Sequence, residues 1–367
     1  MAEKDRPCPD FRPPSGIRPQ TIPVTTIASP PALPVIYFTH MTTFQTLGLP
    51  DGLVTALARL NIHTPTDVQA QAFPTLSEGQ DAWLSAPTGS GKTLAYLLPL
   101  IAKLDRSTID LQVAVLVPTQ ELAVQINDTI RELDTTASLG LRCQLLIGNA
   151  SIIRQKEKLK KKPHIVVGTS GRMLDLGLSG KLKLHKCRAV CIDEADNLLA
   201  KDHIGDIQAF LKLTPSERQL VFASATAQGS AFKIAETLGH NVQWIRGENL
   251  QTHLPVEHFY IGSSYNQKTD VIREFLKIVQ PEKTLVFAMR NETAEHIGRR
   301  LEKSTLPHAV LHGGMDKFER QMAMKQFRQG TARILIASDL AARGMDIKGL
   351  THVINFDLPP VSGDYLH

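Results

Sequence analysis

The segment Ala82-Trp-Leu-Ser-Ala-Pro-Thr-Gly-Ser-Gly-Lys-Thr93 decides the fold, because it joins a short apolar run to a glycine-rich turn and then to a helical pattern. Glycines let the backbone curl so that successive N–H groups face phosphates, and the following helix adds its positive N-terminus. The segment is therefore interpreted as a P-loop, with Ala86 standing where the generic pattern has glycine. The strand before it and the helix after it disfavour a glycine-rich turn without a ligand.

Short apolar runs continue downstream of this segment and alternate with stretches of helical period. A run that is apolar at consecutive positions is typical of a strand that is buried on both faces of a parallel sheet. Alternation of such strands with helices predicts βαβ architecture. The runs are Val113–Val117, Ile165–Val167, Ala189–Ile192 and Leu220–Ala223, and helical patterns such as Gln120–Leu133 and Ser151–Lys162 lie between them.

The pattern breaks in the polar stretch Gly239–Pro255 and then resumes. Further strands are predicted at Thr284–Phe287, Ala309–Leu311, Arg333–Ala337 and His352–Phe356, with helices at Thr293–Glu302 and Lys317–Gln329. We therefore expect a first domain over residues 41–245, a linker over 246–257 and a second domain over 258–367. Residues 1–34 hold 9 of the 22 prolines, which predicts a disordered tail over residues 1–40.

Composition sets broad limits on the class of protein. The 367 residues are 42% apolar and 21% charged, with a net charge of +5, which permits a polyanionic partner without requiring one. No apolar run is long enough to cross a membrane and no signal peptide is visible, so a cytoplasmic protein is expected. The four cysteines are too few and too scattered for a disulfide framework, and Cys187 and Cys191 are interpreted as core residues.

A second chemical motif is Asp193-Glu-Ala-Asp196, which follows the apolar run Ala189–Ile192. An acid at the end of a buried strand can hold Mg²⁺ opposite a P-loop hydroxyl, here Asp193 opposite Thr93, while Lys92 meets the β- and γ-phosphates of the nucleotide. Glu194 is then placed to orient and deprotonate the attacking water. An acidic helix N-terminus is the structural alternative, and the P-loop upstream favours the catalytic interpretation.

These two motifs together resemble the DEAD-box RNA helicase family, and Thr64-Pro-Thr-Asp-Val-Gln69 resembles its Q motif. The resemblance implies two tandem RecA-like parallel-sheet domains with ATP and Mg²⁺ as cofactors. Gln69 would bond to adenine, and Phe44 would stack on its ring. The implied ATP contacts in the P-loop are Ala86, Pro87, Thr88, Gly89, Ser90, Gly91, Lys92 and Thr93, and Asp339 of Ser338–Asp346 would reach the ribose.

The resemblance also implies backbone contacts to RNA. Pro118–Leu122 and Thr169–Arg172 resemble family motifs that grip the sugar–phosphate backbone, so RNA binding would be sequence-independent. Gln120 replaces an arginine, and Ile147-Gly-Asn149 replaces a Gly-Gly position, so we expect weaker RNA binding. The implied RNA-binding residues are Thr119, Gly171, Arg172, Gly313 and Arg343, and those implied to couple nucleotide state to strand separation are Ser224, Thr226 and Asp196.

The resemblance covers residues 44–367 and stops at His367, where the family continues with an arginine motif. We therefore expect the second domain to be incomplete. The resemblance implies an ATP-dependent RNA helicase that hydrolyses ATP to ADP and phosphate, coupled to local RNA duplex unwinding or remodelling of RNA–protein complexes. Two alternatives stay open: an ATP-gated RNA-binding clamp with little hydrolysis, and a DNA translocase. Protein partners, the RNA target and the oligomeric state cannot be predicted from the sequence.

A basic run, Lys156 to Lys162, belongs to none of these motifs. It contains five lysines at positions 156, 158, 160, 161 and 162. One interpretation is added attraction for RNA. The other, which we favour from sequence, is a solvated helix end where lysines complement the helix dipole.

Overall fold

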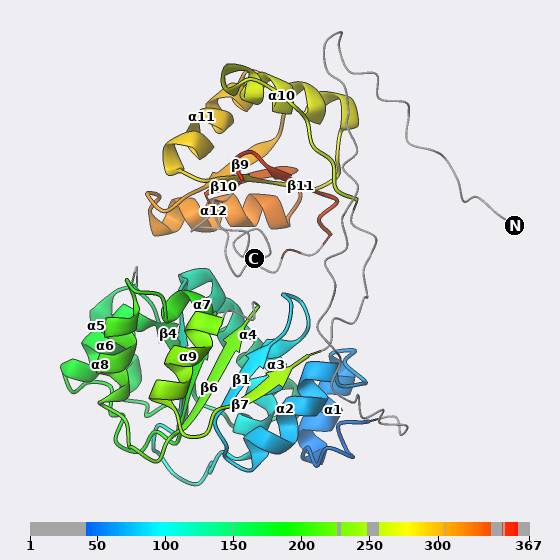
Figure 1. The fold of residues 1–367 in the computed structure, drawn as a ribbon. Helices are drawn as coiled ribbons and strands as arrows, with labels where there is room; N and C mark the ends of the chain where they lie inside the picture. The colour runs from blue at the N-terminus through cyan, green and yellow to red at the C-terminus, as the bar shows by residue number, and fades with distance from the viewer. Residues whose placement is uncertain are drawn as a thin grey trace, which may run out of the picture.

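The computed structural model describes residues 42–148, 150–225, 229–247, 257–304, 306–338, 347 and 349–358. The tail predicted over residues 1–40 lies outside this part of the chain. The described residues form two α/β units, each built on a parallel sheet (Figure 1). The predicted fold class is confirmed, with the second unit being the smaller.

The first sheet has seven strands in the order β3-β4-β2-β5-β6-β1-β7, and every neighbouring pair is parallel. Its central strands are buried along their whole length, in keeping with their continuous apolar runs. The strands are β1 (Ala82–Ser85), β2 (Val113–Val117), β3 (Cys143–Leu146), β4 (Ile165–Thr169), β5 (Ala189–Asp193), β6 (Gln219–Ser224) and β7 (Gln243–Arg246).

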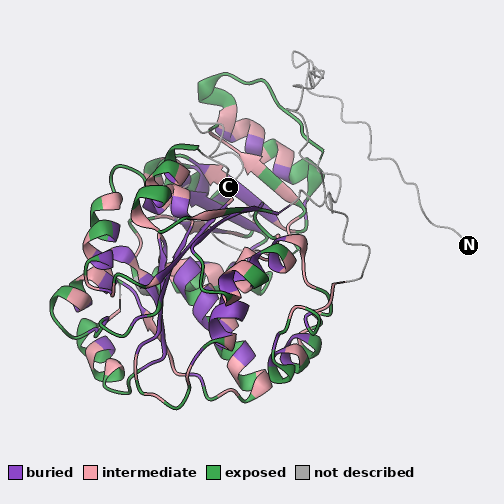
Figure 2. Cartoon of the chain, turned by 60° about the horizontal axis from the view of Figure 1, so that its bottom comes forward, coloured by how far each residue is buried: buried purple, intermediate pink, exposed green. Residues whose placement is uncertain are grey.

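Helices cover both faces of this sheet, and Figure 2 shows the buried strands between them. One face packs against α1 (Asp51–Arg59), α2 (Asp67–Ser77), α3 (Lys92–Ala102) and α4 (Gln120–Ala137). The other packs against α6 (Ser170–Leu178), α7 (Ala195–Leu198), α8 (Ile204–Leu211) and α9 (Gly229–Leu238). The helix α5 (Ile152–Leu159) contacts the edge strand β3.

The second sheet has the order β11-β8-β10-β9, again with parallel neighbours. Its strands are β8 (Thr284–Ala288), β9 (His308–Leu311), β10 (Ile334–Ser338) and β11 (His352–Asn355). Apolar side chains of α12 (Lys317–Arg328) pack on one face, and those of α10 (Lys268–Val279) and α11 (Asn291–Glu302) pack on the other. A short 3₁₀ turn, η1 (Tyr265–Gln267), precedes α10.

The polar stretch Gly239–Pro255 was described from sequence only as a break in the pattern of strands and helices. It contains β7, which pairs with β1 along its four residues. Only Ile245 of β7 is buried, because an edge strand packs little of its surface. The strand therefore has no continuous apolar run from which it could be predicted. Arg246 therefore belongs to the first sheet instead of the predicted linker, and the other domain boundaries stay predictions.

Two compositional predictions can be compared with the structure. Cys187 and Cys191 are fully buried among apolar side chains, which confirms them as core residues. Within the described ranges, no helix combines the length and the apolar character that crossing a membrane requires.

The two units touch through an ion pair between α4 and α12. Arg320 Nε donates to Glu121 Oε1 at 3.0 Å, and Arg320 Nη1 donates to the carbonyl of His312 at 3.0 Å. The Arg320 and Glu121 side chains are only 15% and 23% exposed, so water screens this pair less than a surface pair. The contact joins the first turn of α4 to the second domain.

We predict that Arg320→Ala weakens domain closure, because it leaves the Glu121 carboxylate half-buried without its partner. The expected loss is roughly 1–2 kcal/mol of interdomain free energy. Energy transfer between dyes placed on the two domains would measure the closed fraction. Arg320→Glu combined with Glu121→Arg should recover part of the loss, and equal closure in all variants would contradict the prediction.

Candidate nucleotide and RNA site

The strand order divides the carboxyl edge of the first sheet into two halves. The adjacent strands β5, β6 and β1 lead into Asp193-Glu-Ala-Asp196, Ser224 and the P-loop. The adjacent strands β3, β4 and β2 lead into Gly148, Thr169–Arg172 and Pro118–Leu122. Ligands of open α/β sheets bind beyond this edge. The motifs predicted for ATP therefore lie in one half and those predicted for RNA in the other.

The P-loop has the backbone geometry that its glycines permit. Gly89 and Gly91 have φ angles of 80° and 88°, which L-residues rarely adopt. A Cβ on Gly91 would lie 2.4 Å from Gln69 Nε2, so a side chain there would displace the Gln69 amide. The ammonium of Lys92 donates to the carbonyls of Ala86 and of Pro87, at 2.9 Å for the latter. The α3 helix begins at Lys92, which directs its N-terminus at the loop.

Gln69 is buried and joins two parts of the site. Its Nε2 donates to the Gly91 carbonyl at 3.1 Å, and its Oε1 accepts from Thr66 N at 3.0 Å in the capping box of α2. In this structure the amide supports the P-loop, a role that the motif resemblance did not indicate. Phe44 is 2% exposed in the apolar core, so stacking on adenine would require neighbouring side chains to move and stays a prediction.

The carboxylate of Asp193 is held at the end of β5 by two donors. Tyr96 Oη donates to its Oδ2 at 2.8 Å, and Glu194 N donates to its Oδ1 at 2.9 Å. Tyr96 lies three residues after Thr93 in α3, so the same helix carries the P-loop hydroxyl and a support for the acid. Glu194 is half-buried with φ of 49°, a strained conformation that is concentrated at functional sites.

Charges around Lys92 link the P-loop to the acidic motif. Burial lowers the pKa of the Lys92 ammonium, while the carboxylates of Asp193, Asp196 and Glu194 oppose this shift. Burial also raises the pKa of the Asp193 carboxyl, opposed by the Tyr96 hydrogen bond and the Lys92 charge. The Asp193 carboxylate and the Thr93 hydroxyl both interact with Tyr96, and they offer the oxygen ligands that Mg²⁺ prefers. The residues present therefore fit this metal.

A hydrogen bond joins the acidic motif to Ser224. Ser224 Oγ donates to Asp196 Oδ2 at 2.6 Å, and the Ser224 carbonyl accepts from Ala86 N at 3.2 Å. The serine at the end of β6 thus touches both the acidic motif and the P-loop. Thr226, the other predicted coupling hydroxyl, lies outside the described residues.

The residues predicted to contact RNA also have local structural partners. Thr119 caps α4, where its hydroxyl accepts from Leu122 N at 3.3 Å, and it is only 7% exposed. The Arg172 guanidinium donates to the carbonyls of Gly148 at 2.6 Å and Ala150 at 3.0 Å. It therefore fixes the loop that follows β3. Gln120 Nε2 approaches the Cβ position of Gly148, which places a neutral amide beside that loop.

Gly171 is the second residue of α6, beside Arg172. A Cβ added to it would meet only the Asp206 carboxylate, at 3.8 Å. In the second domain, Gly313 N donates to Asn291 Oδ1 at 3.3 Å in the turn after β9. Asp339 and Arg343, predicted to face ATP and RNA, lie outside the described residues.

Sequence reasoning missed Tyr96, and it missed that Glu121 pairs with Arg320. A helix position three residues after Thr93 shares its face, and this spacing was a usable signal for Tyr96. No local signal pairs Glu121 with Arg320, because they lie in different domains.

The sequence and the fold were also compared with known proteins. Residues 66–234 match the family model described as DEAD/DEAH box helicase, and residues 267–367 match the helicase conserved C-terminal domain. Two solved structures resemble the fold. One is S. cerevisiae Dbp5 bound to RNA and ADP BeF3, with a TM-score of 0.74 and 23% identity over 88% of this chain and 84% of that chain. The other is Mss116p bound to ssRNA and AMP-PNP, with a TM-score of 0.78 and 21% identity over 91% of this chain and 73% of that chain.

Curated relatives are more similar in sequence. The DEAD-box ATP-dependent RNA helicase CshC of Bacillus cereus is 40% identical over 302 residues, which are 82% of this chain and 77% of the relative. The ATP-dependent RNA helicase CshA of Listeria monocytogenes is 34% identical over 328 residues, which are 89% of this chain and 63% of the relative. This degree of identity, over both matched domains, shows that the chain belongs to the DEAD-box ATP-dependent RNA helicase family.

Proposed function

We propose that this chain couples hydrolysis of ATP to ADP and phosphate with local opening of short RNA duplexes or remodelling of RNA–protein complexes. The observation that carries the proposal is that the P-loop with Lys92 and the three carboxylates of the acidic motif lie at the ends of β1 and β5, both neighbours of β6, where the carboxylates act electrostatically on the ammonium. Phosphoryl transfer needs positioning and charge stabilisation more than covalent chemistry, and this cluster supplies both.

In the proposed nucleotide site, the P-loop residues 86–93 bind the phosphates, with Lys92 turning from the loop carbonyls toward the β- and γ-phosphates. Gln69 bonds to the adenine, Phe44 packs against it, and Asp339 contacts the ribose from the second domain. Thr93 and Asp193 would hold Mg²⁺, which neutralises charge on the transferring phosphate when bound. Tyr96 keeps the Asp193 carboxylate oriented for this task.

Glu194 is proposed as the residue that positions the attacking water and accepts its proton. Its backbone is anchored to the Asp193 carboxylate and to the first turn of α7, so the side chain projects from a fixed point. A carboxylate that is partly withdrawn from solvent is suited to act as a general base.

RNA is proposed to bind through its backbone and 2′-hydroxyls, at Thr119, Gly171 and Arg172 in the first domain and Gly313 and Arg343 in the second. RNA laid across both domains would favour closure, supported by the Glu121–Arg320 pair. Ser224 and Asp196, with Thr226, would transmit the nucleotide state. We propose a cytoplasmic location, where both ATP and RNA are available.

We predict that Glu194→Gln lowers ATP turnover by about 10²–10⁴-fold, because the amide cannot accept the proton of water. Binding of a fluorescent ATP analogue and of RNA should stay within a few-fold of the unsubstituted protein. Steady-state phosphate release measures the first quantity, and fluorescence titration measures the second. Glu157→Gln, on the exposed side of α5, is the matched control, and a near-normal rate for Glu194→Gln would refute the assigned role.

We predict that Tyr96→Phe raises the Mg²⁺ concentration that half-saturates ATP hydrolysis by several-fold. The ring volume is kept, but the Asp193 Oδ2 loses its donor and the carboxylate can rotate. The maximal rate at saturating Mg²⁺ should change little. Titration of the rate with Mg²⁺ makes the measurement, and an unchanged half-saturation would show that Tyr96 is only a core residue.

We also predict that RNA stimulates the ATPase more strongly than DNA of the same sequence, because the 2′-hydroxyl distinguishes the two. The measurement is the rate of phosphate release at saturating concentrations of each strand. Equal stimulation by DNA would favour a DNA translocase. Binding of ATP and RNA without RNA-stimulated turnover would favour the ATP-gated clamp.

A further inference from the structure

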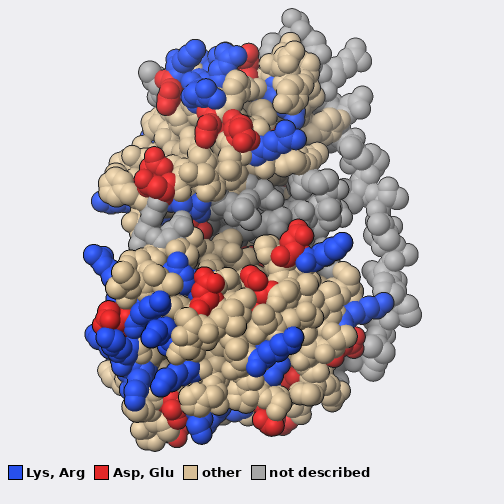
Figure 3. Space-filling view, turned by 90° about the vertical axis from the view of Figure 1, so that its left-hand side faces the viewer, with Lys and Arg blue, Asp and Glu red and all other residues tan. Residues whose placement is uncertain are grey.

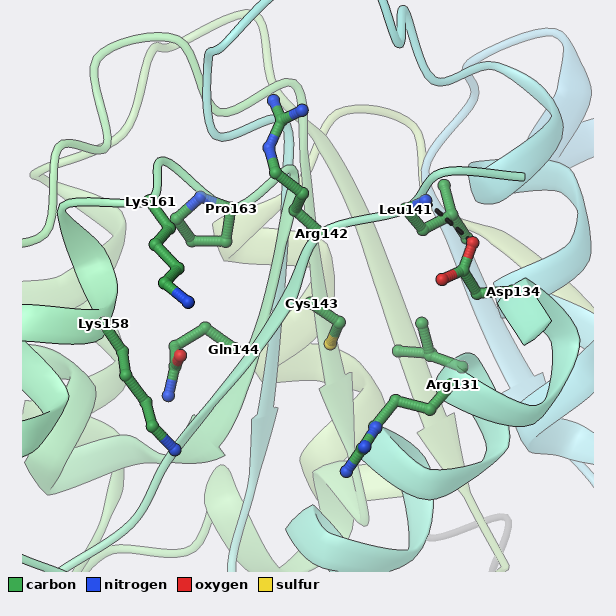
Figure 4. Close-up of a pocket in the computed structure, with 10 residues that line it drawn as sticks. Arg131, Asp134, Leu141, Arg142, Cys143, Gln144, Lys158, Lys161 and Pro163 are labelled. Carbon is green, nitrogen blue, oxygen red and sulfur yellow. Dashed lines mark hydrogen bonds between the residues drawn. The ribbon is translucent and has the colours of Figure 1, made fainter. Parts of the chain in front are cut away.

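A cavity of about 250 Å³ opens at the edge of the first sheet, away from the nucleotide motifs. We call it the β3-edge pocket. Figure 4 shows its walls: Lys158 and Lys161 from the end of α5 on one side, Arg131 from α4 on the other, and Cys143 and Gln144 of β3 between them. The remaining lining residues are Ile130, Asp134, Leu141, Arg142 and Pro163.

The pocket carries four cations against a single carboxylate. Asp134 Oδ1 accepts from Leu141 N at 2.8 Å, so this carboxylate is engaged with the backbone. Arg142 is engaged too, since its guanidinium donates to the carbonyls of Lys162 and Thr108. The side chains of Arg131, Lys158 and Lys161 form no ion pair or hydrogen bond with any described residue and are exposed. Their charge is available to an anion.

The floor of the pocket is neutral. Burial raises the pKa of the Cys143 thiol to about 12, so the sulfur carries no negative charge at neutral pH. A thiol with such a pKa is also a poor nucleophile. The pocket is therefore suited to hold an anion by charge and hydrogen bonds, and has no group for covalent chemistry.

One carbonyl on the outer edge of β3 is already hydrogen-bonded. The Arg142 carbonyl accepts from Ile165 N, the first residue of the neighbouring strand β4, so the carbonyl of Leu145, three residues on, points to the outer side. Gln144 Nε2 donates to this Leu145 carbonyl at 2.8 Å. A strand adding at this edge would compete with the Gln144 amide for the Leu145 carbonyl.

The pocket is connected to the predicted RNA half of the site by α5. Gln155 is buried, and its Nε2 donates to the carbonyls of Ile147 at 2.9 Å and Ala150 at 3.1 Å, which ties α5 to the loop that Arg172 also holds. The eight residues of α5 span ~12 Å, the rise of three to four base pairs along a nucleic acid duplex. Figure 3 shows Lys and Arg side chains gathered on this flank of the first domain.

We propose that the β3-edge pocket binds phosphates of the RNA where it extends beyond the loop held by Arg172. The proposal rests on the proposed RNA-binding function and adds a second contact to it. Arg131, Lys158 and Lys161 are the phosphate-binding residues, and Gln144 and the neutral Cys143 line the floor. The occupant is recognised by its regularly spaced negative charge, so binding here is independent of base sequence.

The test compares Lys158→Gln/Lys161→Gln with Lys183→Gln/Lys186→Gln, a pair of exposed lysines outside the pocket that changes the net charge equally. Fluorescence anisotropy would measure affinity for a short RNA strand and for the same strand extended by about six nucleotides at each end. For the extended RNA, we expect the pocket variant to bind roughly 5- to 20-fold more weakly than the control pair, with a salt slope smaller by about 1.4. For the short RNA, the two variants should bind alike.

The outcomes separate this proposal from the function on which it rests. If the unsubstituted protein binds no RNA, the proposed function fails, and this proposal with it. If it binds RNA but the two variants bind the extended strand equally, only the pocket proposal is overturned. The proposal would be overturned as well if the pocket variant bound short and extended RNA with equally reduced affinity. The long-range electrostatic field of the protein would then explain the loss. The proposal would also be overturned if the pocket variant lost binding to a fluorescent oligoglutamate while its RNA affinity stayed unchanged. The occupant of the pocket would then be an acidic protein.

Discussion

Parallel pairing in the first sheet is the constraint on which the site depends. Because every strand runs in one direction, all carboxyl ends meet at a single edge, and the loops that follow them are brought within reach of each other. The buried strands cannot slip, since a shift of one residue would move apolar side chains between the two cores. The positions of Lys92, Asp193 and Ser224 are thus set by the packing of strands and helices that lie far from them in the sequence.

Several polar contacts then make the edge of the sheet rigid. Gln69 joins α2 to the P-loop, Tyr96 joins α3 to Asp193, and Ser224 joins β6 to Asp196. Each is buried or half-buried, where an unpaired polar group would be costly, so each holds its partner firmly. Residues that resemble ligand contacts in the motifs are therefore also structural supports, and substitutions at them act on both roles.

Many features of the fold and of the candidate site could be predicted from short segments of the sequence. The P-loop, the acidic motif and most strands were predicted because continuous apolar runs and glycine spacing are local properties of the chain. The edge strand β7 was missed because it packs little and has no such run. Thr119 and Arg172 were predicted as RNA contacts, but their roles as a helix cap and a loop support depend on neighbours that motifs do not specify.

The sequence by itself determined the fold class, the family and the chemical identity of the nucleotide motifs, because these depend on residue type and spacing along the chain. Only the tertiary structure decided which motifs are neighbours. The strand order β3-β4-β2-β5-β6-β1-β7 differs from the chain order, so the P-loop after β1 lies in the same half of the sheet edge as the motifs after β5 and β6, although the three RNA motifs lie between them in the sequence. The tertiary structure also shows that Lys158 and Lys161, which the sequence favoured as part of a solvated helix end, line a pocket together with Arg131. The physical reason is that a cavity forms between surfaces, and its walls come from elements that are distant along the chain.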